Sequence, residues 1–136
     1  MRFKDFIKEG KVKKGEKDSQ LAISLIDTAK QDLNFLNAIK LTEISARRLV
    51  INYYDVLRSL IEALAALDGL KVYSHEAFTY YLQEKKEDIL SRKFDRFRKI
   101  RNGLSYYGKE INITEAEDIL IEMKSIISNL LNTIHK

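Results

Sequence analysis

The side chains best suited to chemistry lie in RKIRNGLSYYG, residues 98–108. Arg98 and Arg101 are permanent cations whose forked N–H donors match phosphate and carboxylate oxygens. Asn102 adds an amide and Tyr106 a phenol, beside two glycines that can end a helix. The segment therefore suits an anionic ligand. An arginine that lies over the core, or pairs with a carboxylate, explains the same residues without any ligand, and periodicity does not separate the two explanations.

The residues before this segment place it on an amphipathic helix. Between Lys85 and Arg101 there are eight Lys/Arg against three Asp/Glu, interleaved with apolar side chains. At helical spacing the apolar positions form one stripe, which Arg98 and Arg101 border on one side. Arg101 is therefore expected at an edge of the buried face. The stripe consists of Phe94, Phe97, Ile100, Leu104 and Tyr107.

Other catalytic patterns are missing from the sequence. There is no cysteine, and neither His75 nor His135 follows an acidic residue at the Glu-x-x-His spacing used by metal sites in helical bundles. Both histidines are expected at the surface, and no metal or cofactor is expected. The chain also lacks a glycine-rich phosphate loop and a Gly-x-Ser-x-Gly elbow. Three acidic residues cluster in a predicted first helical turn, where the helix dipole favours negative charge without any catalytic role. They are Glu115, Glu117 and Asp118.

The run from Arg101 to Tyr106 resembles the Arg-Asn-x-x-x-His motif of HEPN domains. The resemblance covers roughly residues 18–135 and implies a small helical bundle with a long antiparallel helix pair, a motif helix and a final amphipathic helix. It also implies a symmetric homodimer in which the Arg101 ends of two motif helices share a cleft. In active members of the family, arginine and histidine cut RNA there without a metal.

Tyr106 stands where the HEPN motif has its histidine. A phenol with an ordinary pKa of about 10 stays protonated at neutral pH and is a poor general base, whereas imidazole titrates near neutrality. Efficient cleavage is therefore not expected. Residues five apart on a helix also point about 140° away from each other. Either the helix loosens near Gly103 and Gly108, or Arg101 and Tyr106 serve different surfaces.

Three functions fit these residues. The preferred one is a HEPN-like binding module that holds RNA, a nucleotide or another anion with Arg98, Arg101, Asn102 and Tyr106. The second is a toxin-like, metal-independent endoribonuclease in which Arg101 and Tyr106 are the catalytic candidates and another group moves protons. The third, implied by the resemblance, is the helical partner of a minimal nucleotidyltransferase in a toxin–antitoxin pair.

Composition predicts the elements that carry the site. The chain has 136 residues, 45% of them hydrophobic, with no proline and five glycines. This favours one all-α domain with a single core. Apolar spacing and capping residues predict long helices near 19–39, 43–68, 90–106 and 115–134, and a short helix that starts after Ser74. The expected fold is a bundle of four to five helices.

The positive charge is concentrated at the N-terminus. Residues 1–17 hold seven Lys/Arg against three Asp/Glu, while the other residues carry seventeen of each sign. This segment is expected to be a mobile basic arm ahead of a single domain over 18–136. The arm suits a phosphate backbone, and a solvated lysine tail explains it equally. No apolar run is long enough to cross a bilayer or resembles a signal peptide, so the expected location is the cytoplasm, without a membrane partner.

Overall fold

The computed structural model describes residues 1–134, and within them the chain forms an all-α bundle with one minor sheet. The fold class predicted from the sequence is thereby confirmed. In chain order the elements are α1 (Phe3–Lys8), β1 (Val12–Lys14), α2 (Ser19–Asn37), α3 (Ala46–Leu67), β2 (Leu70–Val72), α4 (His75–Glu84), α5 (Asp88–Tyr106) and α6 (Ile113–Ile134).

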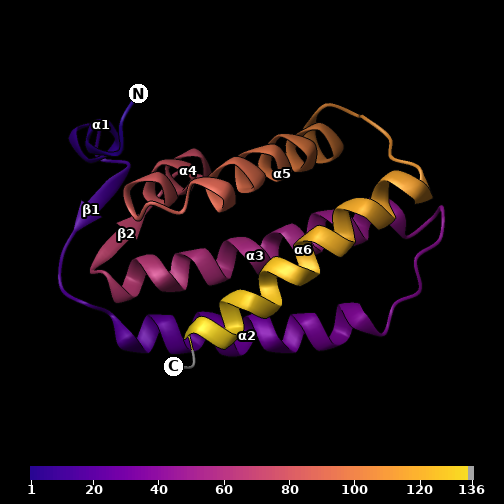
Figure 1. The fold of residues 1–136 in the computed structure, drawn as a ribbon, viewed down its shortest axis with the longest axis horizontal. Helices are drawn as coiled ribbons and strands as arrows, with labels where there is room; N and C mark the ends of the chain where they lie inside the picture. Colours follow the sequence, from indigo (N-terminus) through magenta and orange to yellow (C-terminus); the bar gives the residue numbers. More distant parts are fainter. Residues whose placement is uncertain (135–136) are drawn as a thin grey trace.

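Helix α3 lies at the centre of the bundle (Figure 1). It is buried along most of its length, because apolar side chains occupy more than one of its faces. Helix α2 runs antiparallel along one side of α3, as the short connection between them predicts, and α6 crosses α3 at an angle. Helices α4 and α5 follow each other along the opposite side and pack on α3. The candidate motif thus lies at the end of a helix that rests on the central one.

The helix ends follow from local residues. Asp18 caps α2 by accepting a hydrogen bond from the Leu21 amide at 3.0 Å. Gly69 ends α3 with φ +77, and a Cβ at this position would lie 2.5 Å from the Gly15 carbonyl oxygen, so only glycine fits. Helix α6 starts at Ile113, two residues before its predicted start, and the Asn112 side chain accepts a hydrogen bond from the Glu115 amide at 2.8 Å.

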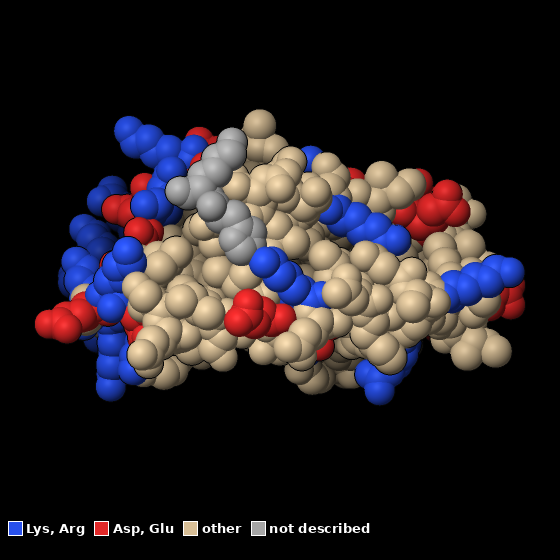
Figure 2. Space-filling view, turned by 90° about the horizontal axis from the view of Figure 1, so that it is seen from below, with Lys and Arg blue, Asp and Glu red and all other residues tan. Residues whose placement is uncertain are grey.

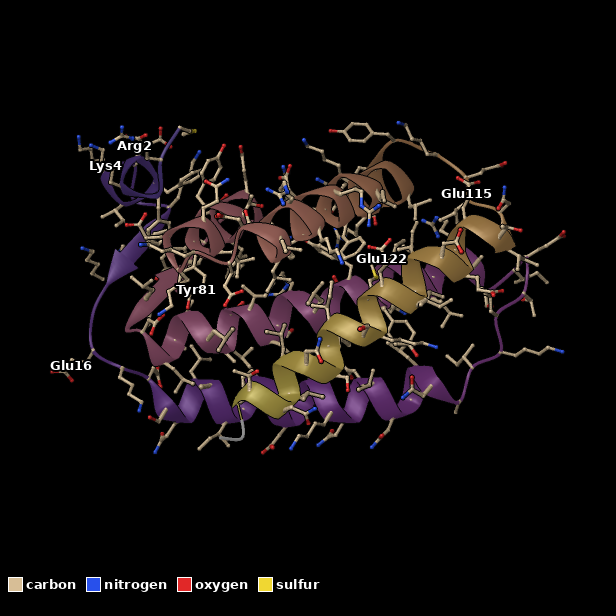
Figure 3. All side chains as sticks on the ribbon, in the orientation of Figure 1. Arg2, Lys4, Glu16, Tyr81, Glu115 and Glu122 are labelled. Carbon is tan, nitrogen blue, oxygen red and sulfur yellow. The ribbon has the colours of Figure 1, made fainter. Side chains whose placement is uncertain are left out.

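Polar contacts between helices fix their relative positions (Figure 3). The Tyr81 hydroxyl of α4 donates to Asp68, just after α3, at 2.6 Å. Arg96 of α5 donates to the Glu122 carboxylate of α6, also at 2.6 Å. The buried Ser91 hydroxyl of α5 donates to a backbone carbonyl of α4 at 2.9 Å. Helices α4 and α5 are therefore tied to each other and to their neighbours.

The N-terminal segment differs from its prediction as a mobile arm over residues 1–17. Phe3 and Phe6 of α1 are buried against α4, where the Phe6 ring lies 5.1 Å from that of Tyr80. Strand β1 pairs antiparallel with β2, with Val12 opposite Val72. Few but well-spaced apolar residues anchor this lysine-rich segment, so it belongs to the same packed body as the rest of the chain.

The surface charge is uneven. Figure 2 shows Lys and Arg side chains gathered at the end of the molecule where α1 and β1 lie, while the middle of this face carries few charges. Among the helices of residues 1–134, none is both long enough and apolar enough to cross a lipid bilayer.

Candidate anion-binding site

Two arginines of α5 have largely buried side chains. The side chains of Arg98 and Arg101 are each only 16% exposed. An Arg98 Nη2 donates to Asp95 Oδ1 on the same helix at 2.9 Å. Arg101 Nη2 lies 3.8 Å from Asp55 Oδ1 of α3, which is beyond hydrogen-bond range. The Arg101 guanidinium therefore lies between α5 and α3, at the edge of the core, whereas that of Arg98 is held by a carboxylate of α5 itself.

Each of these guanidinium groups has an unused donor. The Nε atoms of Arg98 and Arg101 are buried and have no hydrogen-bond partner within the part of the chain that the structure describes. An unpaired buried donor costs roughly 1–3 kcal/mol, and such groups are rare in folded proteins. The two arginines are thus incompletely satisfied by their protein neighbours.

Tyr106 meets Arg101 although five residues separate them. Arg101 Nη1 donates to the Tyr106 hydroxyl at 2.7 Å, and the guanidinium carbon lies 5.1 Å from the centre of the phenol ring. Helix α5 stays regular through Tyr106, so Arg101 and Tyr106 leave the helix in different directions. The long Arg101 side chain reaches across to the phenol. The chain turns away only afterwards, at Gly108 with φ +66. Tyr106 remains 67% exposed, which leaves this pair open to a ligand or partner.

The last turn of α5 is held in place from α3. Arg47 Nε donates to the Leu104 carbonyl at 3.1 Å, which satisfies one of the free carbonyls at the helix end. Asn102 lies in this turn and is half-buried. Its side chain makes no hydrogen bond with any residue in the described range, so the geometry links Arg98, Arg101 and Tyr106 more closely than it links Asn102.

Helix α3 contributes residues that the sequence did not single out. Tyr54 is buried, and the Arg101 guanidinium carbon lies 5.8 Å from the centre of its ring. Arg58, one turn further along α3, donates to Glu62 at 2.6 Å. Their spacing of four places both on one side of α3. That spacing is a weak signal, because the apolar pattern of α3 does not reveal which of its sides faces the motif helix.

His75, the first residue of α4, also joins this group. Its Nδ1 lies 3.3 Å from the Tyr54 hydroxyl in a part-buried contact, although the residue as a whole is exposed, as predicted. Burial, with smaller contributions from the charges of Arg58, Arg101 and Arg98, lowers the pKa of His75 to about 4. The imidazole is therefore neutral at pH 7. His135, the other candidate histidine, lies outside the described residues.

The carboxylates in this region offset only part of the positive charge. Burial raises the pKa of Asp55, while Arg101 and Arg58 act in the opposite direction. Burial also opposes ionisation of Asp95, but hydrogen bonds from Arg98 and Lys99 outweigh it and lower the pKa of Asp95. We refer to this group of residues as the arginine site. It consists of Tyr54, Asp55, Arg58, Glu62, His75, Asp95, Arg98, Lys99, Arg101 and Tyr106.

A separate groove lies away from the arginine site. Its volume is about 610 Å³, and side chains of α3, α4, α5 and α6 line it, among them Leu64, Leu90 and Ile126. Its lining is mostly apolar, and its two lysines are paired with carboxylates, Lys85 with Asp68 and Lys93 with Glu122. The groove is therefore less suited to an anion than the arginine site. Across residues 1–134, no three His, Asp or Glu side chains lie close enough together to hold a metal ion.

Comparison with known proteins does not assign this site. The chain matches no protein-family model, no curated protein and no solved structure.

Proposed function

We propose that this chain is a HEPN-like binding module for RNA, a nucleotide or another phosphate-bearing anion. The observation that supports this most is the pair of arginines, Arg98 and Arg101, each nearly buried and each with an unused Nε–H donor within residues 1–134. Guanidinium groups bind phosphate oxygens through two parallel hydrogen bonds. An anion at this site would complete the hydrogen bonding that the protein leaves unfinished.

A purely structural role explains these contacts less well. Arg98 is paired with Asp95, but Arg101 lies too far from Asp55 to form a hydrogen bond with it. The shortest polar contact of the Arg101 side chain, at 2.7 Å, is with the neutral and exposed hydroxyl of Tyr106. An arginine kept only for stability would be expected to bind a carboxylate directly. Arg101 is instead free to exchange a phenol for an anion.

Binding without efficient cleavage is the activity that fits the motif. The Tyr106 hydroxyl donates and accepts hydrogen bonds, but a phenol stays protonated near neutral pH and is a poor general base. General acid–base assistance contributes roughly 100- to 10,000-fold to rate, so its loss would leave binding intact and cleavage slow. The phenol can therefore orient a phosphate that Arg101 holds.

The test is a comparison of single arginine variants. Fluorescence anisotropy of a labelled single-stranded RNA, with nucleotides as competitors, would be measured for the native chain, Arg98→Ala, Arg101→Ala and the control Arg92→Ala. Arg92 is exposed on the same helix, so its loss removes the same charge away from the site. Because hydrogen bonds to charged groups contribute about 1.5–3 kcal/mol, each site variant should bind at least about tenfold more weakly. Equal binding by Arg101→Ala and Arg92→Ala would contradict the proposal.

A further inference from the structure

Groups from three helices surround the buried ring of Tyr54. Arg58 comes from α3, His75 from α4, and Arg98 and Arg101 from α5. The Arg101 guanidinium carbon lies 5.8 Å from the centre of the Tyr54 ring, and His75 Nδ1 lies 3.3 Å from the Tyr54 hydroxyl. Arg101 and His75 therefore meet at one side chain and do not form an extended track.

We infer that the arginine site takes a terminal phosphate, a phosphomonoester dianion such as that of a nucleoside monophosphate, and that His75 becomes protonated as one of its binding groups. This inference rests on the proposed function and narrows it to one class of ligand. A phosphomonoester offers three terminal oxygens and close to two negative charges, which suits donors that approach from different helices.

The charges of the arginine site support a dianion. Arg58, Arg98, Arg101 and Lys99 carry four positive charges, and Glu62, Asp95 and Asp55 carry three negative ones. With neutral His75 the group has a net charge of about +1, which matches a phosphodiester. With protonated His75 it has about +2, which matches a phosphomonoester. A dianion is therefore the ligand that favours protonation of the imidazole.

Proton uptake follows from the causes of the low His75 pKa. Burial and three nearby arginines disfavour the imidazolium. A bound dianion would offset the arginine charges and add an attractive charge, so the pKa of His75 should rise. By linkage, protonation of His75 should strengthen binding of the dianion to the same extent. The other ionisable groups that face the His75 ring are Tyr54, Arg58, Arg98 and Arg101. Their charges do not change near neutral pH.

The first part of the test compares ligand classes by isothermal titration at pH 7. Adenosine monophosphate should bind at least about tenfold more tightly than the dinucleoside phosphate ApA, a difference of about 1.4 kcal/mol. Adenosine, which lacks a phosphate, should not bind measurably. Equal affinity for monoester and diester would overturn the inference. If neither adenosine monophosphate nor ApA binds, and Arg101→Ala leaves RNA binding unchanged, the proposed function itself is contradicted.

The second part isolates the proton. Inorganic sulfate is the probe, because it stays a dianion between about pH 5 and pH 8, the range in which histidines usually titrate. Sulfate affinity of the native chain should weaken as pH rises through the bound-state pKa of His75. The slope should vanish in His75→Gln and persist in the control His135→Gln. A slope that survives in His75→Gln would overturn the inference.

A measurement on the native chain covers the case in which the variant folds poorly. Ring NMR signals of His75 would be titrated with acid in the absence and presence of saturating sulfate. The pKa should start at about 4 and rise by about two to three units when sulfate is bound, within the range expected from a nearby opposite charge, so that the imidazolium is populated at the pH of the sulfate titration. An unchanged pKa with sulfate bound would contradict the role given to His75.

Discussion

At the scale of single residues, Tyr106 is the position at which we predict that binding and cleavage separate. It contacts Arg101 directly, so an imidazole at this position would lie beside the same guanidinium. We predict that Tyr106→His introduces metal-independent RNA cleavage within the roughly 100- to 10,000-fold range of general acid–base catalysis. The measurement is cleavage of labelled RNA in excess EDTA, with Tyr107→His, a change in the next exposed phenol, as control. Rapid cleavage by the native chain that Tyr106→Phe abolishes would refute this account.

His75 should also make the stability of the fold depend on pH. Its pKa is about 4 in the folded chain and near 6.5 when unfolded. The unfolded state therefore binds more protons between these values, and the contribution of neutral His75 is complete above about pH 6.5 and lost as pH falls toward 4. Urea unfolding should show that His75→Gln loses less stability than the native chain between about pH 7 and pH 5. The expectation fails if His75→Gln and His135→Gln lose equal amounts.

At the scale of elements, the long helices were predictable and their convergence was not. Apolar residues at spacings of three and four, with caps such as Asp18 and Gly69, predict the four long helices to within a few residues. The small sheet was missed because each strand has three residues and β1 lies in a lysine-rich segment. Tyr54 and His75 were missed as site residues because only tertiary packing brings α3 and α4 beside α5.

The packing of α1 yields a test at the same scale. Phe6 is fully buried, whereas Lys8 on the same helix is exposed. Phe6→Ala should destabilise the fold by about 3–5 kcal/mol, the usual cost of deleting a buried aromatic ring, and Lys8→Ala by less than about 0.5 kcal/mol. Both values come from denaturant unfolding. A small effect of Phe6→Ala, similar to that of Lys8→Ala, would restore the expectation of a mobile arm.

At the scale of the whole molecule, we expect a symmetric homodimer built around the ends of two α5 helices. Tyr106 and Tyr107 are exposed there beside Arg101, and the HEPN resemblance implies that two such ends share a cleft. Two copies of Arg101 would repel each other unless an anion lies between them. Light scattering at micromolar concentration should therefore detect a dimer whose fraction rises with added sulfate, and Arg101→Ala should lose this response. A monomer with and without sulfate would contradict the expectation.

The most direct test of the anion site observes the two arginines themselves. The Nε–H groups of Arg98 and Arg101 have no hydrogen-bond partner among the described residues. Nitrogen-15 NMR observes these groups directly through their Nε–H signals. The native chain would be titrated with adenosine monophosphate while all arginine signals are followed. We expect the Nε–H signals of Arg98 and Arg101 to shift together and saturate at one ligand concentration, while that of Arg92 stays unchanged. Saturable binding that leaves both site signals in place, or no binding at all, would contradict it.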